Sequence, residues 1–161
     1  MLELRGNYNI FDLPQDGEAL CITTNGIVKA NGCAVMGAGI AKQADDIFHI
    51  SPRLGTYLKK YGNRVFNMGK FINASQTKAI YVITFPTKHH FKDDSDITLI
   101  CKSCEQLVEM CDKFGITKCY LTPPGCGCGH LSYENLVRPW ISMILDDRFV
   151  VVDSRTNVKI C

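Results

Sequence analysis

The sequence NGIVKANGCAVMGAGIA, from Asn25 to Ala41, is the most informative segment of this chain. An apolar run from Glu18 to Ile22, typical of a buried strand, precedes it, and a helical pattern begins near Ile40. The segment is therefore predicted to be a loop from a strand to a helix. Glycine residues leave the main chain without Cβ atoms, which allows amides to approach a ligand closely. The glycines of the loop are Gly26, Gly32, Gly37 and Gly39.

Unpaired amides at the start of a helix meet the positive end of the helix dipole, and such a loop commonly binds a diphosphate. A glycine-rich surface loop without a ligand is the alternative, because glycine spacing is a weak signal by itself.

Strand-like and helix-like segments alternate along the rest of the chain. Strands are expected at residues 2–5, 18–23, 65–74, 79–85, 116–122 and 149–153, and helices after residue 40, after Ser51, after Ser95 and after Ser132. The three serines are expected to cap their helices, and Pro139 to kink the last helix or to mark its true start. This order predicts one α/β domain over residues 1–161, with a mixed, largely parallel sheet between two helical layers.

A second glycine-rich loop, PPGCGCGHLS, covers residues 123–132 and again precedes a helix. Ligands of parallel sheets bind beyond the carboxyl ends of the strands. We therefore expect the two glycine loops, and the loop that holds Lys88, to share one edge and to hold a diphosphate from two sides. Structural turns without a ligand remain the alternative.

Composition narrows the function classes. The chain has 161 residues, and its 18 basic and 16 acidic residues give a net charge of +2. This balance is too weak for a dedicated nucleic-acid binder, so nucleic acid is expected only as a locally presented substrate. No apolar run has the length of a membrane helix, and we expect a monomeric cytoplasmic protein with no membrane partner.

Cysteine and histidine residues form two patterns that resemble known sites. Cys126, Cys128 and His130 have C-x-C-x-H spacing, but structural zinc uses two pairs of ligands, so no metal is expected. Cys101 and Cys104 stand in a C-x-x-C pattern within a helix, where a buried apolar role explains Cys104 better than redox chemistry.

Lys88 directly follows an apolar strand at the predicted ligand edge. A lysine there can attract phosphate, or attack a sugar carbon if its pKa is lowered. A solvated loop lysine is the alternative. The neighbouring His89 and His90 are expected to be exposed and not beside a carboxylate.

The order strand, TTN, MGAGIA, long helix, strand, P-x-GCG-x-G, helix resembles the macrodomain family, which binds ADP-ribose. The resemblance covers Leu4 to Asp153. The segments MGAGIA, FPTKHHF and GCGCGHL look most like phage-encoded members and antitoxin macrodomains that remove ADP-ribose from DNA. MGAGIA and the GCG loop also resemble a eukaryotic hydrolase that acts on acidic side chains, although Gly129 stands in place of that enzyme's aspartate.

The resemblance implies roles for individual residues. Lys88 and Asn25 match catalytic positions, Asn25 by holding the distal ribose. Asn7 stands where many members have an aspartate that accepts from the adenine amino group. The implied ligand-binding residues are Asn7, Thr24, Gly32, Val35, Met36, Gly37, Ala38, Gly39, Ile40, Pro124, Gly125, Cys126, Gly127, Cys128 and Gly129.

The implied function is binding of ADP-ribose and its hydrolytic removal from a modified macromolecule, either nucleic acid, including DNA, or protein, without a cofactor. Two alternatives remain: a binding module without turnover, and a phosphatase that acts on ADP-ribose 1″-phosphate. The implied setting is the cytoplasm of a bacterium or of a phage-infected cell.

Overall fold

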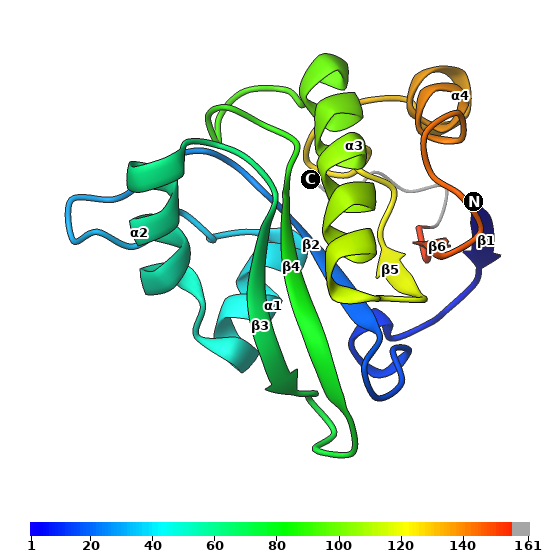
Figure 1. The fold of residues 1–161 in the computed structure, drawn as a ribbon. Coiled ribbons are helices and arrows are strands. Elements are labelled where there is room, and N and C mark those ends of the chain that lie inside the picture. The colour runs from blue at the N-terminus through cyan, green and yellow to red at the C-terminus, as the bar shows by residue number, and fades with distance from the viewer. Residues whose placement is uncertain (156–161) are drawn as a thin grey trace.

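A six-stranded sheet lies at the centre of residues 1–155, the part of the chain that the computed structural model describes. Its strands follow the order β1-β6-β5-β2-β4-β3 (Figure 1). They are β1 Leu2–Arg5, β2 Ala19–Thr24, β3 Phe66–Ile72, β4 Ala79–Pro86, β5 Cys119–Leu121 and β6 Phe149–Asp153. All neighbouring strands are parallel except β3 and β4. The predicted mixed, largely parallel sheet is confirmed.

Helices lie on both sides of this sheet (Figure 1). They are α1 Gly39–Phe48, α2 Ser51–Tyr61, α3 Ile97–Phe114 and α4 Arg138–Ile141, with a 3-10 turn η1 Ile10–Asp12 and a π-helical turn η2 Tyr133–Val137. Among residues 1–155, no helix is long and apolar enough to cross a bilayer.

Alternating side chains of the strands supply two separate apolar cores. On β2, Leu20 and Ile22 face the core that α1 and α2 cover, whereas Ala19 and Cys21 face the core under α3 and α4. Because successive side chains of a strand point to opposite faces, a continuous apolar run is buried on both sides. Because each face of the sheet carries its own apolar core, helices cover both faces and the domain has three layers. Cys104 is fully buried in the α3 core, as expected for an apolar role.

Five segments leave the sheet at the carboxyl ends of parallel strands. Residues 6–9 follow β1, residues 25–38 follow β2, residues 87–96 follow β4, residues 122–132 follow β5, and Ser154 and Arg155 follow β6. Strand β2 lies between β5 on one side and β4 on the other, so the chain crosses over β2 through α3 on its way from β4 to β5. A crevice forms where connections leave a sheet in opposite directions, and this is where ligands of such sheets bind.

The helix starts differ in part from the sequence expectations. Asp96, not Ser95, caps α3, because its side chain accepts a hydrogen bond from the Thr98 amide at 2.9 Å. Helix α2 begins at Ser51 itself, one residue earlier than expected, so its N-cap is Ile50 and not Ser51. Ser132 caps η2 as predicted, and the chain changes from π to α geometry at Arg138, next to Pro139.

Candidate functional site

A cleft of about 740 Å³ opens at the carboxyl rim of the sheet. This volume is in the usual range for small-molecule sites. Most of the residues predicted to bind a ligand line the cleft: Thr24, Asn25, Val35, Met36, Gly37, Ala38, Gly39, Ile40, Lys88, Gly125, Gly127, Cys128 and Gly129. Four predicted residues lie outside the lining: Asn7, Gly32, Pro124 and Cys126.

The first glycine loop is a small hairpin held by the Asn25 side chain. Asn25 Oδ1 accepts a hydrogen bond from the Ile27 amide, and Nδ2 donates one to the Val35 carbonyl, both at 3.0 Å. A bridge between Val28 and Ala34 lies between these two arms. The Asn25 amide group therefore keeps one N–H and one lone pair for a ligand.

Gly32 lies at the tip of this hairpin, against α2 and away from the cleft. A Cβ atom built on Gly55 of α2 would lie 1.9 Å from the Gly32 carbonyl oxygen. The glycine at residue 55 therefore permits close contact between helix and hairpin. Gly32 itself has a φ angle of +88° at the hairpin tip, which favours glycine, and it does not line the cleft in which it was predicted to bind a ligand.

The amides at the start of α1 face the cleft. Residues 35–41 line it, and Ala38, the N-cap residue of α1, provides no side-chain hydrogen bond to the helix. The first amides of a helix have no partner within the helix. They are therefore available to an anion, in the field of the helix dipole. A Cβ atom at Gly37 would meet nothing within 4 Å, so this residue borders open space.

The second glycine loop is packed tightly on Ser95. A Cβ atom at Gly129 would lie 2.1 Å from Ser95 Oγ and 2.5 Å from the Gly125 carbonyl oxygen. Gly125 has a φ angle of +75° and would place a Cβ atom 2.8 Å from the Ser95 Cβ. Both glycines are therefore required by the close approach of loop and helix start. A side chain at residue 129 therefore does not fit this loop as it is packed here.

Lys88 connects the loop after β4 with the second glycine loop. Its Nζ donates hydrogen bonds to the Cys128 carbonyl at 3.0 Å and to the Phe91 carbonyl at 3.4 Å. Its own carbonyl accepts from Asn63 Nδ2 at 2.9 Å. Lys88 thus has a fixed position in the cleft wall and is not a freely solvated loop residue.

Two histidines near the cleft form hydrogen bonds with carboxylates that the sequence did not reveal. His89 Nε2 lies 2.9 Å from Asp96 Oδ2, and this hydrogen bond holds the pKa of the Asp96 carboxyl below its usual value. The expectation that His89 has no carboxylate beside it is therefore wrong. His130 Nδ1 lies 2.8 Å from Asp94 Oδ1, which connects the second glycine loop with the loop after β4.

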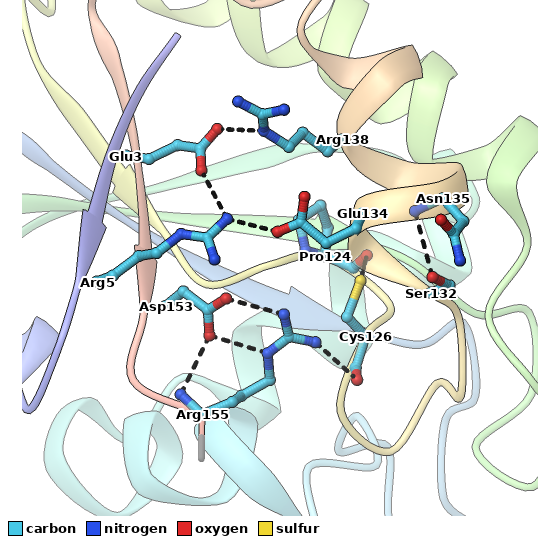
Figure 2. A network of polar contacts seen from close by, with 10 residues as sticks. All are labelled: Glu3, Arg5, Pro124, Cys126, Ser132, Glu134, Asn135, Arg138, Asp153 and Arg155. Carbon is cyan, nitrogen blue, oxygen red and sulfur yellow. Dashed lines mark hydrogen bonds and ion pairs between the residues drawn. The ribbon is translucent and has the colours of Figure 1, made fainter. Parts of the chain in front are cut away.

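Arg155 holds the other side of the second glycine loop (Figure 2). Its guanidinium forms two hydrogen bonds of 2.9 Å with the Asp153 carboxylate, and its Nη1 donates to the Cys126 carbonyl at 3.3 Å. The Arg155 guanidinium keeps the pKa of Asp153 below its ordinary value. It also lies 5.5 Å from the centre of the Tyr133 ring. Arg155 lines the cleft, and its charge is paired there with the Asp153 carboxylate.

The C-x-C-x-H segment does not form a metal site with neighbouring groups. Within residues 1–155, no group of three or more histidine, cysteine or acidic side chains could hold a metal ion. Burial raises the pKa of the Cys126 thiol to about 12, and its Sγ donates to the Pro124 carbonyl at 3.3 Å. A cysteine binds a metal ion as the thiolate, so this environment disfavours metal binding by Cys126.

Several lining residues were absent from the sequence-based site. Residues 8–11 line the cleft beside the end of β6, and the Ser154 hydroxyl donates to the Tyr8 carbonyl at 3.3 Å. Asn7 is exposed and lies outside the lining. Ser95 lines the cleft with a buried Oγ that has no hydrogen-bond partner among the described residues. For Ser154 and Arg155, the sequence offered one signal: both residues directly follow a predicted strand.

The rim loops, the start of α1 and the crossover at β2 define an α/β protein with a cleft at the carboxyl rim of its sheet. No protein-family model matches the sequence, and no curated protein matches it. Solved structures do match. The macrodomain of Mycobacterium tuberculosis DarG has 23% identity and a TM-score of 0.73, covering 96% of this chain and 99% of that one. The macrodomain of Thermus aquaticus DarG has 24% identity, the same TM-score and the same coverage.

A third match is Thermosipho africanus DarTG in complex with ADP-ribose, with 21% identity and a TM-score of 0.71. It covers 95% of this chain and 41% of that chain. These likenesses extend over nearly the whole sequence. The chain has the macrodomain fold.

Proposed function

We propose that the cleft binds ADP-ribose, with the diphosphate between the start of α1 and the second glycine loop. The observation that carries this proposal is that both loops line one cleft at the same rim of the sheet. Amides from two sides, the α1 dipole and the charge of Lys88, which has no carboxylate partner among the described residues, all favour an anion there. The structure of Thermosipho africanus DarTG, which has this fold, contains ADP-ribose.

We further propose that the protein hydrolyses the bond between the distal ribose and an attached macromolecule. Either water or the Lys88 amine attacks the C1″ carbon, the bond from C1″ to the attached group breaks, and that group takes up the proton that the nucleophile loses. If Lys88 attacks, a water molecule then releases ADP-ribose from its nitrogen. Both routes consume one water molecule and need no redox partner.

The contacts of Asn25 and Lys88 suit this reaction. The free N–H of Asn25 can hold a ribose hydroxyl, because its other polar atoms fix the hairpin. The Lys88 amine is already placed in the cleft wall by two carbonyl groups. Placement of a reactive group before the substrate binds lowers the barrier by reducing the freedom lost on reaction.

A binding module without turnover is the second candidate, and one observation favours it. The two carbonyl groups that hold Lys88 accept hydrogen bonds from its ammonium group and so oppose its use as a neutral nucleophile. In that case Lys88 serves to position the second glycine loop and to attract the ligand.

Two measurements test these proposals. Calorimetry with ADP-ribose should show one binding site per chain, and no detectable binding at millimolar ligand would refute the binding proposal. Release of ADP-ribose should then be compared for ADP-ribosylated DNA, ADP-ribosylated acidic and serine peptides, and ADP-ribose 1″-phosphate. Release from a macromolecule supports the hydrolase, release of phosphate alone supports the phosphatase, and tight binding without release supports the binding module.

A further inference from the structure

The charges of the chain are divided between two regions. Between Asp46 and Asp93 the sequence has no acidic residue and eight of its 18 basic ones. These are Arg53, Lys59, Lys60, Arg64, Lys70, Lys78, Lys88 and Lys92. All 16 acidic residues lie outside this stretch, together with ten basic ones. The net charge of +2 therefore conceals a strongly basic region that contains α2, β3 and β4.

The basic residues of this region have no carboxylate partners in the described structure. Among residues 1–155, none of the eight forms a salt bridge. The four arginines outside the region are all paired with carboxylates, as Figure 2 shows for Arg5, Arg138 and Arg155. The positive charge of the region therefore stays uncompensated and available to an anionic partner.

The end of α2 lies beside the Lys88 loop, at the rim that carries the cleft. Asn63 Nδ2 donates to the Lys88 carbonyl at 2.9 Å, and the Gly26 amide donates to the His89 carbonyl at 3.2 Å. In Figure 1 this end of α2 and the connection after β4 lie at the same end of the sheet, at the top of the view. A chain that leaves the cleft past Lys88 therefore meets residues 59–64.

Exposed aromatic surface accompanies the charges there. Tyr61 is 56% exposed, and its ring lies 6.3 Å from Tyr57 and 6.2 Å from Phe66. Lys60 Nζ lies 5.2 Å from the centre of the Tyr61 ring. Because Tyr57 and Phe66 pack against the Tyr61 ring, this side chain would lose little conformational freedom when it stacks on a flat ligand. Lysine and arginine around an exposed ring are the features by which proteins bind unpaired bases and their phosphates.

We propose that the α2 basic face, defined as Lys59, Lys60, Tyr61 and Arg64, binds single-stranded nucleic acid. The cations contact consecutive phosphates and Tyr61 stacks on one base. An acidic peptide would satisfy the charges but would leave the ring without a partner, and a duplex would hide its bases from the ring. A nucleic-acid strand that carries ADP-ribose would continue from this face into the cleft, and this continuation alone rests on the proposed function.

The test is fluorescence anisotropy with a labelled, unmodified oligothymidine strand, the matching uridine strand, and a duplex of the same length. The triple variant Lys59→Ala, Lys60→Ala, Arg64→Ala should bind the strand at least ten-fold more weakly than the wild type. For single strands, each phosphate contact contributes about 0.7 to the slope of log affinity against log salt. Because the variant removes three cations, its slope should be less steep than that of the wild type by about 2 units. The matched control is Lys102→Ala, Lys113→Ala, Lys118→Ala, which removes the same charge from α3 and the residue before β5, and which should bind like the wild type.

Tyr61 separates stacking from charge. Tyr61→Ala should weaken strand binding several-fold, whereas Tyr61→Phe should retain it. Equal losses in the two triple variants would overturn the proposal, as would absence of strand binding by the wild type or tighter binding of the duplex. Tighter binding of the thymidine strand would identify DNA as the ligand, and tighter binding of the uridine strand would identify RNA. ADP-ribose affinity should be unchanged in every variant, so failure of the wild type to bind ADP-ribose would refute the proposed function and leave the strand result standing.

Discussion

The amide of Ser95 donates a hydrogen bond of 3.0 Å to the carbonyl oxygen of Gly129, at the point where the start of α3 meets the second glycine loop. This contact leaves no room for a side chain at residue 129, since a Cβ atom would lie 2.1 Å from Ser95 Oγ. The shape of one wall of the cleft thus depends on a residue that the sequence suggested only as a helix cap.

Gly129→Ala should destabilise the protein by about 1–3 kcal/mol, the usual range for overpacking, and should weaken ADP-ribose binding. Chemical unfolding monitored by circular dichroism would measure the loss. Gly127→Ala is the control, because a Cβ atom there meets nothing within 4 Å, and its effect should stay below about 0.5 kcal/mol. Similar values for both variants would contradict the tight packing on Ser95.

Gly37→Phe should lower ADP-ribose affinity at least 100-fold without changing stability. The new side chain projects into open space in the cleft, at a residue without a positive φ angle. Calorimetry measures the affinity and a thermal melt measures the stability. Ala30→Phe adds the same bulk to an exposed residue of the same loop, outside the cleft lining, and should bind normally. Retained affinity in Gly37→Phe would place the ligand elsewhere.

Lys88→Arg and Lys88→Ala should both retain ADP-ribose binding within a few-fold and lose at least 100-fold in the release of ADP-ribose. Arginine keeps the charge and the hydrogen-bond donors but cannot act as a nucleophile, because it stays protonated. Lys29→Ala, on the exposed part of the first loop, is the control. Loss in the alanine variant alone would indicate attack by water. Unchanged rates in both variants would remove Lys88 from the mechanism.

Asp96→Ala should cost about 1 kcal/mol of stability, because it removes the N-cap of α3. Ser95→Ala should be close to neutral or stabilising, since the buried Ser95 Oγ has no partner among the described residues and its removal relieves that penalty. Urea unfolding of the two variants gives the comparison. A larger loss for Ser95→Ala would restore the original sequence-based assignment of the cap.

Arg155→Ala should make stability less dependent on pH at acid values. Arg155 lowers the pKa of Asp153 in the folded state, so the pair stabilises the protein above the ordinary carboxyl pKa of about 4. This contribution is lost as pH falls through the lowered pKa of the folded state. The variant should therefore be less stable at pH 7, by up to about 1 kcal/mol for a partly exposed pair. The difference from the wild type should shrink from pH 4 downward.

Unfolding at several pH values measures this effect. Arg155→Lys keeps the charge and loses the paired hydrogen bonds, so it should lie between the alanine variant and the wild type. A difference from the wild type that stays constant down to pH 2 would show that Arg155 acts by packing on Tyr133 and not through Asp153.

Local patterns in the sequence were sufficient for the secondary structure and for the rim of the sheet. The apolar run at β4 predicts a strand buried on both faces, and Gly115 predicts the end of α3, where it has a φ angle of +64°. Both glycine loops were placed after strands and before helices for the same reason. These features depend on residues close in sequence, through the periods of strand and helix and through the freedom of glycine.

The contacts across the cleft depend on packing between distant segments. Lys88 and Cys128 are 40 residues apart, and Asp94 and His130 are 36 residues apart. The sheet order places the connections after β4 and β5 on opposite sides of β2, and only then do these groups meet. Gly32 was predicted from its place in the first loop to contact a ligand, but in the folded chain it packs on α2 and does not line the cleft.

The sequence alone therefore established the layers, the two glycine loops and the edge of the sheet at which they lie, because hydrophobic period and glycine spacing are local properties. The folded chain established that Lys88 is held by Cys128, that Arg155 belongs to the cleft and that the end of α2 adjoins it. Such contacts follow from the distances between elements after they pack, and no spacing along the chain encodes those distances.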